Sequence, residues 1–156
     1  MKPLHCLLLC LALVDQAQAD DLMDNADLAV GNDLGEPLVV RLLPLAAGQA
    51  ALIEQQGAGN RAALDQSGQA LLGRIVQAGG AQEAYILQQG SDLSATISQQ
   101  GYGNDASIRQ SGSSNSAAIE QVGNRNSASI DQRGTGLNST VTQVGNGQQI
   151  HITQYR

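Results

Sequence analysis

Residues 95–112 read ATISQQGYGNDASIRQSG and contain two copies of one pattern. In each copy a small residue, a branched aliphatic residue and a glutamine occupy every second position, and a glycine follows two places after the glutamine. A spacing of two is the period of a β-strand, so these three side chains are expected on one face. Glycine and the asparagine after it are turn formers. The stretch therefore predicts two short strands joined by an arc.

The same pattern recurs every eleven residues over the last two thirds of the chain. The repeat glutamines are Gln55, Gln66, Gln77, Gln88, Gln99, Gln110, Gln121, Gln132, Gln143 and Gln154. The branched aliphatic residues two places before them are Ile53, Leu64, Ile75, Ile86, Ile97, Ile108, Ile119, Ile130, Val141 and Ile152. The glycines two places after them are Gly57, Gly68, Gly79, Gly90, Gly101, Gly112, Gly123, Gly134 and Gly145. The asparagines of the arcs are Asn60, Asn104, Asn115 and Asn126.

A strand and an arc make half a coil, so two units make a coil of 22 residues. The arcs alternate, because one set carries Asn or Gln where the other carries mostly Leu, which predicts two distinct sides. The predicted fold is all-β, a cross-β solenoid of five strand–arc–strand coils over residues 49–156, each climbing about 4.7–4.8 Å. An eleven-residue period is also typical of right-handed helical supercoils. A glycine in every unit would cost such a helix about 1 kcal/mol each, which argues against it.

The chain before the repeat divides into two predicted segments. Residues 1–19 resemble a signal peptide, with Lys2, a short apolar run and the small-x-small site at residues 17–19. Both cysteines, Cys6 and Cys10, lie in that run, so the mature chain is expected to have no disulfide. Residues 20–48 form an acidic leader, which lacks the EF-hand spacing. Its apolar stretch 38–45 is expected to be a loose arm, to dock on the first coil or to act in export.

Several functions are disfavoured by composition. Residues 49–156 carry seven acidic residues and six arginines, without a basic patch, so a nucleic-acid partner is not expected. The mature chain has one histidine, His151, at an outward position, and no cysteine. No nucleophile–base pair or metal set is indicated, so we expect no enzyme activity, no cofactor and no small-molecule substrate.

The solenoid is expected to polymerise. Stacked glutamines can bond along the ladder, and each end coil is predicted to leave its backbone ladder open, which templates a further chain. The residues expected at these polymer ends are Ala51, Ile53, Gln55, Ile150, Ile152 and Gln154. On the outside, Arg109 and Asp131 should lie one coil apart, and like charges should seldom stack directly. An ice-binding surface is disfavoured because the threonines form no flat array.

The spacing Q-x-G-x-G-N-x-A-x-x-x-Q at residues 55–66 and 99–110 resembles the curlin repeat of curli fibres. The stretch 49–53 and the tail 153–156 are similar to the minor subunit, the nucleator, although the last coil has only His151 and Arg156 as basic groups. The resemblance implies a secreted, cell-surface amyloid subunit that converts the major subunit into fibre. It also implies self-association, an export pore and a periplasmic chaperone as partners. A bulk fibre subunit and a non-polymerising solenoid adhesin remain alternatives.

Overall fold

The computed structural model describes residues 41–42 and 48–156, and the described regular structure is entirely β. The predicted signal peptide and most of the predicted leader lie outside these residues. The strands are β1 (Arg41–Leu42), β2 (Ala50–Gln56), β3 (Arg61–Gly80), β4 (Glu83–Tyr102), β5 (Asp105–Ser113), β6 (Ser116–Asn124), β7 (Ser127–Thr135), β8 (Asn138–Asn146) and β9 (Gln149–Tyr155).

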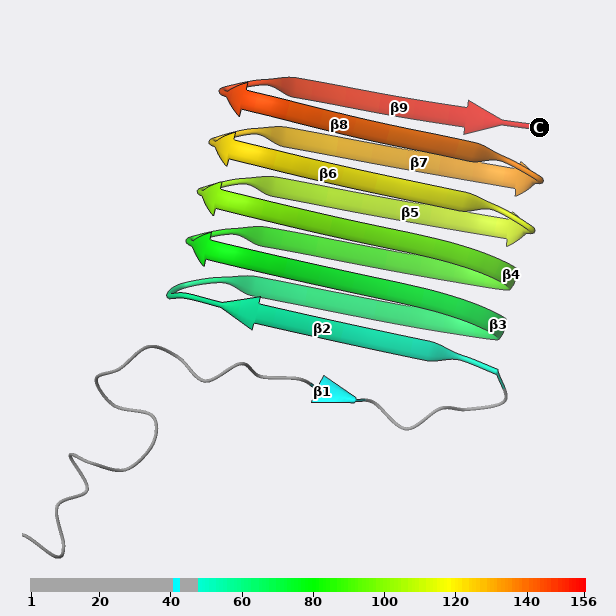
Figure 1. Ribbon diagram of the computed structural model, residues 1–156. Helices are drawn as coiled ribbons and strands as arrows, with labels where there is room; N and C mark the ends of the chain where they lie inside the picture. The colour runs from blue at the N-terminus through cyan, green and yellow to red at the C-terminus, as the bar shows by residue number, and fades with distance from the viewer. Residues whose placement is uncertain (1–40, 43–47) are drawn as a thin grey trace, which may run out of the picture.

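The strands from β2 to β9 wind into a solenoid with a period of 22 residues. Ile53 pairs with Ile75, which pairs with Ile97, so each step along the ladder is one coil. Every pairing from β2 to β9 is parallel and has this same offset. Figure 1 shows the strands stacked in two layers, with β2 at one end and β9 at the other. The predicted fold class, an all-β solenoid of five coils, is confirmed.

Each coil contributes one strand to each layer. One layer contains β2, the second halves of β3 and β4, then β6 and β8. The other contains the first halves of β3 and β4, then β5, β7 and β9. The long strands β3 and β4 therefore bend from one layer to the other, as Figure 1 shows.

The interior contains the three predicted columns of small, aliphatic and glutamine side chains. Ile75, Ile86, Ile97 and Ile108 have 0 % of their surface exposed. The layers lie so close that a large residue on one faces a small residue on the other: a Cβ added to Gly73 would lie 2.5 Å from Leu64 Cδ1. This pairing explains the Ala column of the repeat, since alternation of large and small side chains fills a thin core without voids.

The strands are longer than the five-residue segments predicted from the sequence. β5 to β8 have nine residues each, and β3 and β4 have 20. The ladder continues through the arc because each coil bends in the same way, so that Gly68 pairs with Gly90 and Gly90 with Gly112. The repeat glycines all have positive φ, between 104° and 140°, as the arc requires.

The N-terminal edge of the solenoid differs from the prediction of two open ends. β1 pairs antiparallel with β2, placing Arg41 opposite Ile53 and Leu42 opposite Leu52. The predicted open ladder is therefore wrong at these two positions of β2. At the other end, no described strand pairs with the outer side of β8 or β9. The two ends of the described solenoid are thus unequal.

Candidate polymerisation edges and amide ladders

The ten repeat glutamines form two continuous hydrogen-bonded ladders. In one layer, the side-chain nitrogen Nε2 of Gln55 donates to Oε1 of Gln77, and the series continues through Gln99 and Gln121 to Gln143. In the other layer, the same bonds join the glutamines from Gln66 to Gln154. The N···O distances are 2.6–3.0 Å. These bonds supply the partners that a buried amide needs.

Each glutamine from Gln66 onward also bonds to the opposite layer. Gln99 Nε2 donates to the backbone oxygen of Glu83 at 2.9 Å, and Gln110 Nε2 donates to that of Ser94 at 3.1 Å. Sequence reasoning missed this second bond. The sequence signal for this bond is that every repeat has Gln and never the shorter Asn at this position. The longer side chain is needed because the amide must reach across the interior. The glutamines therefore bind successive coils together and also clamp the two layers.

The arc asparagines, predicted as turn formers, also join successive coils. Asn104 Oδ1 accepts from the backbone N–H of Asn126 at 3.0 Å, and its Nδ2 donates to the oxygen of Gly123 at 2.8 Å. Asn115 does the same on the other side of the solenoid, with Leu137 and Gly134 as partners. The predicted difference between the two arcs is also present: Leu71 and Leu93 fill one side, whereas polar side chains fill the other.

Gln82 occupies an asparagine position and leaves a defect in this column. Its Nε2 donates to Ala78 and Gly101 oxygens, as an asparagine would, but its Oε1 is buried without a partner. The extra methylene places the oxygen where it receives no bond from Asn104, the next residue of the column. It is the one such atom among the described side chains.

We expect Gln82→Asn to stabilise the solenoid by about 1–3 kcal/mol, because it restores a bond and removes a buried unsatisfied oxygen. Denaturant-induced dissociation of fibres measures the change, and Gln100→Asn, at an exposed position on the outer face of β4, is the matched control. Equal effects of the two substitutions would contradict this explanation.

The predicted polymer-end residues lie in the two outermost coils and are less covered than the core. Ile150 is 37 % exposed, whereas the equivalent Ala128 is 2 % exposed. Ile152 and Gln154 are half-buried at the C-terminal edge. At the other edge Ala51, Ile53 and Gln55 are also half-buried. Each edge therefore presents the interior columns partly uncovered.

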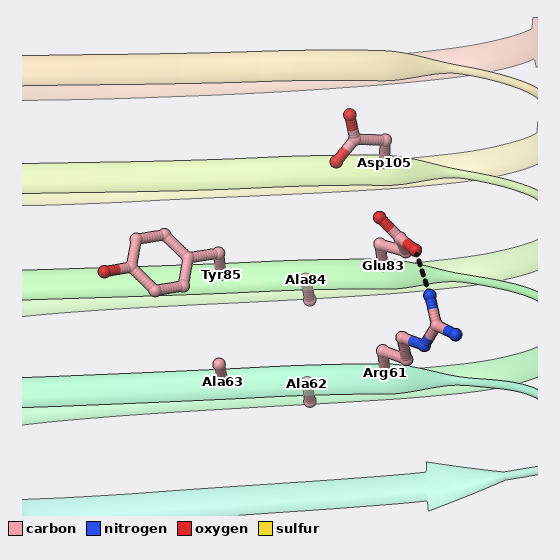
Figure 2. Close-up of a pocket in the computed structure, with 7 residues that line it drawn as sticks. All are labelled: Arg61, Ala62, Ala63, Glu83, Ala84, Tyr85 and Asp105. Carbon is pink, nitrogen blue, oxygen red and sulfur yellow. Dashed lines mark hydrogen bonds and ion pairs between the residues drawn. The ribbon is translucent and has the colours of Figure 1, made fainter.

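The outer faces carry the stacked columns that the repeat predicts, with one pair of like charges. Arg109 lies in register with Asp131, as expected, but Asp131 is ion-paired with Arg133 at 2.9 Å on its own strand. Glu83 and Asp105 are register neighbours and are the one pair of like charges among the paired strands β2 to β9, which agrees with the expectation that like charges seldom stack. Figure 2 shows them one above the other, with Arg61 bonded to Glu83.

The pKa of the Asp105 carboxyl is raised, first by partial burial and second by the negative charge of Glu83. A carboxyl group whose pKa is higher in the folded than in the unfolded chain destabilises the folded state when it is charged. This free-energy penalty is complete above the folded-state pKa and disappears below the unfolded-state pKa of the same group. Acidification through this window therefore strengthens the contact between these two coils.

We expect Asp105→Asn to stabilise the solenoid at pH 7 by about 0.2–1 kcal/mol, since it removes a stacked like charge. It should also reduce the gain in stability on acidification through the window between the raised folded-state pKa of Asp105 and its unfolded-state pKa. Thermal dissociation of fibres across pH measures both effects. Asp65→Asn, on the same face beside Leu87, is the control. An unchanged pH profile in Asp105→Asn would be inconsistent with this assignment.

Within residues 41–42 and 48–156, no three His, Cys, Asp or Glu side chains lie together as a metal site would require. His151 is exposed, and its ring nitrogens contact the hydroxyls of Ser129 and Thr153 at 3.1 and 2.9 Å. No helix in the described part is long and apolar enough to cross a membrane.

The in-register coils and the continuous amide ladders define a parallel cross-β solenoid repeat protein. The family model described as the curlin associated repeat matches residues 68–101, 101–132 and 123–155, which together span more than half of the chain. The chain belongs to the curlin repeat family, whose members are structural components of extracellular curli fibres. No curated protein sequence matches the chain.

Proposed function

We propose that this chain is a secreted functional-amyloid subunit that nucleates or templates curli fibres at the cell surface, for the biofilm matrix and adhesion. The observation that carries the proposal is the C-terminal edge, where β8 and β9 have no described strand on their outer side. Unpaired backbone groups at a sheet edge bind further strands. Solenoids that stay soluble usually cover such an edge with a polar cap.

The side chains at this edge favour a partner of the same repeat type. Val141 and Ile152 end the two aliphatic columns, and Gln143 and Gln154 end the two ladders. A chain with the same period would continue all four columns, burying the aliphatic side chains and bonding the amides. Both a second copy and the major curli subunit have the required chemistry, so we propose both as partners.

The rest of the proposal concerns the chain's path to the surface. We infer that residues 1–19 are a signal peptide, that 20–48 are an acidic leader, and that 49–156 are the working repeat domain. A periplasmic chaperone and an outer-membrane export pore are the partners that this route requires. The nucleating role is supported by the likeness of residues 49–53 and 153–156 to the minor subunit. The chain is proposed to have no enzymatic role.

A seeding assay tests the proposal. The mature chain, expected to be 20–156, is released from denaturant, and thioflavin T fluorescence is followed alone and with freshly denatured major subunit. We expect fibres with a reflection near 4.7–4.8 Å and a shorter lag for the partner at substoichiometric amounts. Fibres that leave the partner's lag unchanged would instead indicate a bulk subunit. A stable soluble monomer would reject polymerisation and favour an adhesin or binding module.

A further inference from the structure

An open depression lies on one side of the solenoid, at the arc where β4, β6 and β8 end. Its volume is about 450 Å³, within the range of about 300–1,000 Å³ that is typical of small-ligand sites. It is lined by Tyr102, Asn124, Arg125, Asn146 and Gly147. Tyr102 is in register with Asn124, and Asn124 with Asn146, so the depression extends over three successive coils of one copy.

The repeat does not explain the two largest side chains of this depression. Gly80 is in register with Tyr102 in the preceding coil, and glycines at 103 and 147 occupy the place of Arg125 in the coils before and after it. Small residues therefore suffice for this arc. Tyr102 is nevertheless 60 % exposed, and Arg125 is exposed with φ +55°, a conformation that glycine adopts more easily. Folding alone requires neither side chain.

The two asparagines of the depression are held in one orientation by the backbone. Asn124 Oδ1 accepts from the backbone N–H of Tyr102 at 3.0 Å, and Asn146 Oδ1 accepts from that of Asn124 at 2.8 Å. None of the described residues accepts from either Nδ2, so both exposed amides keep their donors for a ligand. These donors repeat at the coil spacing of about 4.7–4.9 Å. They are preorganised, because binding requires no rotation of the amides.

Glycines make room for the ring of Tyr102 and for the stem of Arg125. A Cβ added to Gly80 would lie 3.2 Å from Tyr102 Cδ2, and a Cβ added to Gly103 would lie 3.8 Å from Arg125 Cγ. Both side chains therefore lie against the preceding coil. A Cβ added to Gly147 meets nothing within 4 Å, so the backbone of the last coil is uncovered there.

The groups around the depression select an anion that also has a flat apolar face. The two amides and the guanidinium of Arg125 are donors, and no carboxylate lines the depression. A guanidinium binds a carboxylate through two parallel hydrogen bonds. An exposed tyrosine ring offers a flat apolar surface and a polar hydroxyl at its edge. A sugar acid has the matching groups: a carboxylate, hydroxyls that accept from amides, and an apolar face of C–H groups.

We propose that Tyr102, Asn124, Arg125 and Asn146 form a binding site for a uronic-acid unit of an acidic polysaccharide. The Tyr102 ring stacks on the C–H face of the sugar, and the Arg125 guanidinium pairs with its carboxylate. The amides of Asn124 and Asn146 donate to its hydroxyls. The site lies on an arc and not on either end of the solenoid, so every copy in a fibre would display it.

A nucleic acid fits the same depression less well. Arg125 is the one cation among the lining residues, and residues 49–156 carry seven acidic residues and six arginines. Binding of nucleic acid depends on the neutralisation of many phosphates by a basic surface, which is not present around this single arginine. A polysaccharide with one carboxylate in each sugar unit has a lower charge density and requires fewer cations.

The solenoid has a second depression that provides an internal comparison. It is lined in part by Arg61, Glu83, Tyr85 and Asp105 (Figure 2). Arg61 donates to Glu83 at 3.1 Å, and the carboxylate of Asp105 lies in the next coil. This depression also has a tyrosine and an arginine, but its carboxylates repel an anion. We therefore expect no binding of an acidic sugar there.

Equilibrium dialysis against fluorescently labelled tri-galacturonate, a uronic-acid oligosaccharide, measures binding by fibres of the mature chain. Tyr102→Asn and Arg125→Gly each introduce the residue type that the next coil already has at the same place, so the fold is kept. We expect each variant to weaken binding by at least about tenfold. Arg61→Ser/Tyr85→Ser removes the same two groups from the second depression, and this control should change the affinity by less than about threefold.

The methyl ester of the same oligosaccharide lacks the charge and should bind at least about tenfold more weakly. No binding of tri-galacturonate, equal binding of its methyl ester, or unchanged binding by either single variant would overturn the proposal. Tighter binding of an oligothymidylate of equal charge, lost in the same variants, would replace the sugar by a nucleic acid. The site lies within one copy, so a chain that stays monomeric is dialysed in the same way. Failure to form fibres would then reject the proposed function and still test the site.

Discussion

Replacing Gly90 by alanine should prevent the solenoid from forming. Gly90 has φ +139°, a region that L-residues rarely adopt, and an added Cβ would overlap the carbonyl oxygen of Gly112 in the next coil. The strained conformation alone costs about 1–3 kcal/mol. The overlap is with backbone, so the coils must separate and lose ladder bonds. We expect no thioflavin-positive fibres from this variant under conditions in which the unmodified chain assembles.

A matched control separates the overlap from the loss of a glycine. Gly136 also has positive φ, +69°, but a Cβ added there meets nothing within 4 Å. Gly136→Ala should therefore cost only about 1–2 kcal/mol, the ordinary cost of a left-handed alanine, and should still assemble. If the two variants assembled equally well, close stacking of the arcs could not be the reason for the repeat glycine.

The contrast between these glycines shows how far the sequence predicts the fold. The eleven-residue period predicted the layers, the register and the burial of Ile97 and Gln99, because every repeat has the same type of residue at those positions. The repeat glycines were also identifiable for this reason. Each arc has a second residue with positive φ, and this position was not identifiable from the sequence, because different residue types occupy it in successive coils: Ala81, Gly103 and Arg125. Irregular residues give no periodic signal, even where the backbone repeats.

The candidate site was predictable to a similar extent. The sequence placed Gln143 and Gln154 in the ladder and Gln154 at a polymer end, but it did not predict the direction of their amides, which depends on carbonyls 16 residues earlier in the opposite layer. Docking of residues 38–45 on the first coil was one of three predicted alternatives, and β1 lies there, but its antiparallel pairing with β2 was not predicted because a two-residue strand has no detectable period. The defect at Gln82 was visible only as a departure from Asn. Its consequence required the position of one buried oxygen.

The second large effect should come from a single ladder residue, through Gln99→Leu. Gln99 is 1 % exposed, and its amide accepts from Gln77 and donates to both Gln121 and Glu83 O. Leucine fills the space but bonds to none of them. Each buried group left without a partner costs about 1–3 kcal/mol, so a total of about 3–6 kcal/mol is expected. The monomer concentration in equilibrium with fibre should rise more than about 100-fold.

Gln100→Leu provides the control one residue along the same strand, because the Gln100 side chain is exposed on the outside of the solenoid. Its monomer concentration should change by less than about threefold, as for most surface substitutions. A small effect at both positions would mean that burial of the aliphatic columns alone holds the coils together. A large effect at Gln99 alone would show that the amide hydrogen bonds hold the coils together. The same bonds would then give specificity for a partner whose glutamines recur at the same 22-residue period. Aliphatic side chains accept any apolar surface, whereas a ladder of donors accepts only oxygens at matching positions.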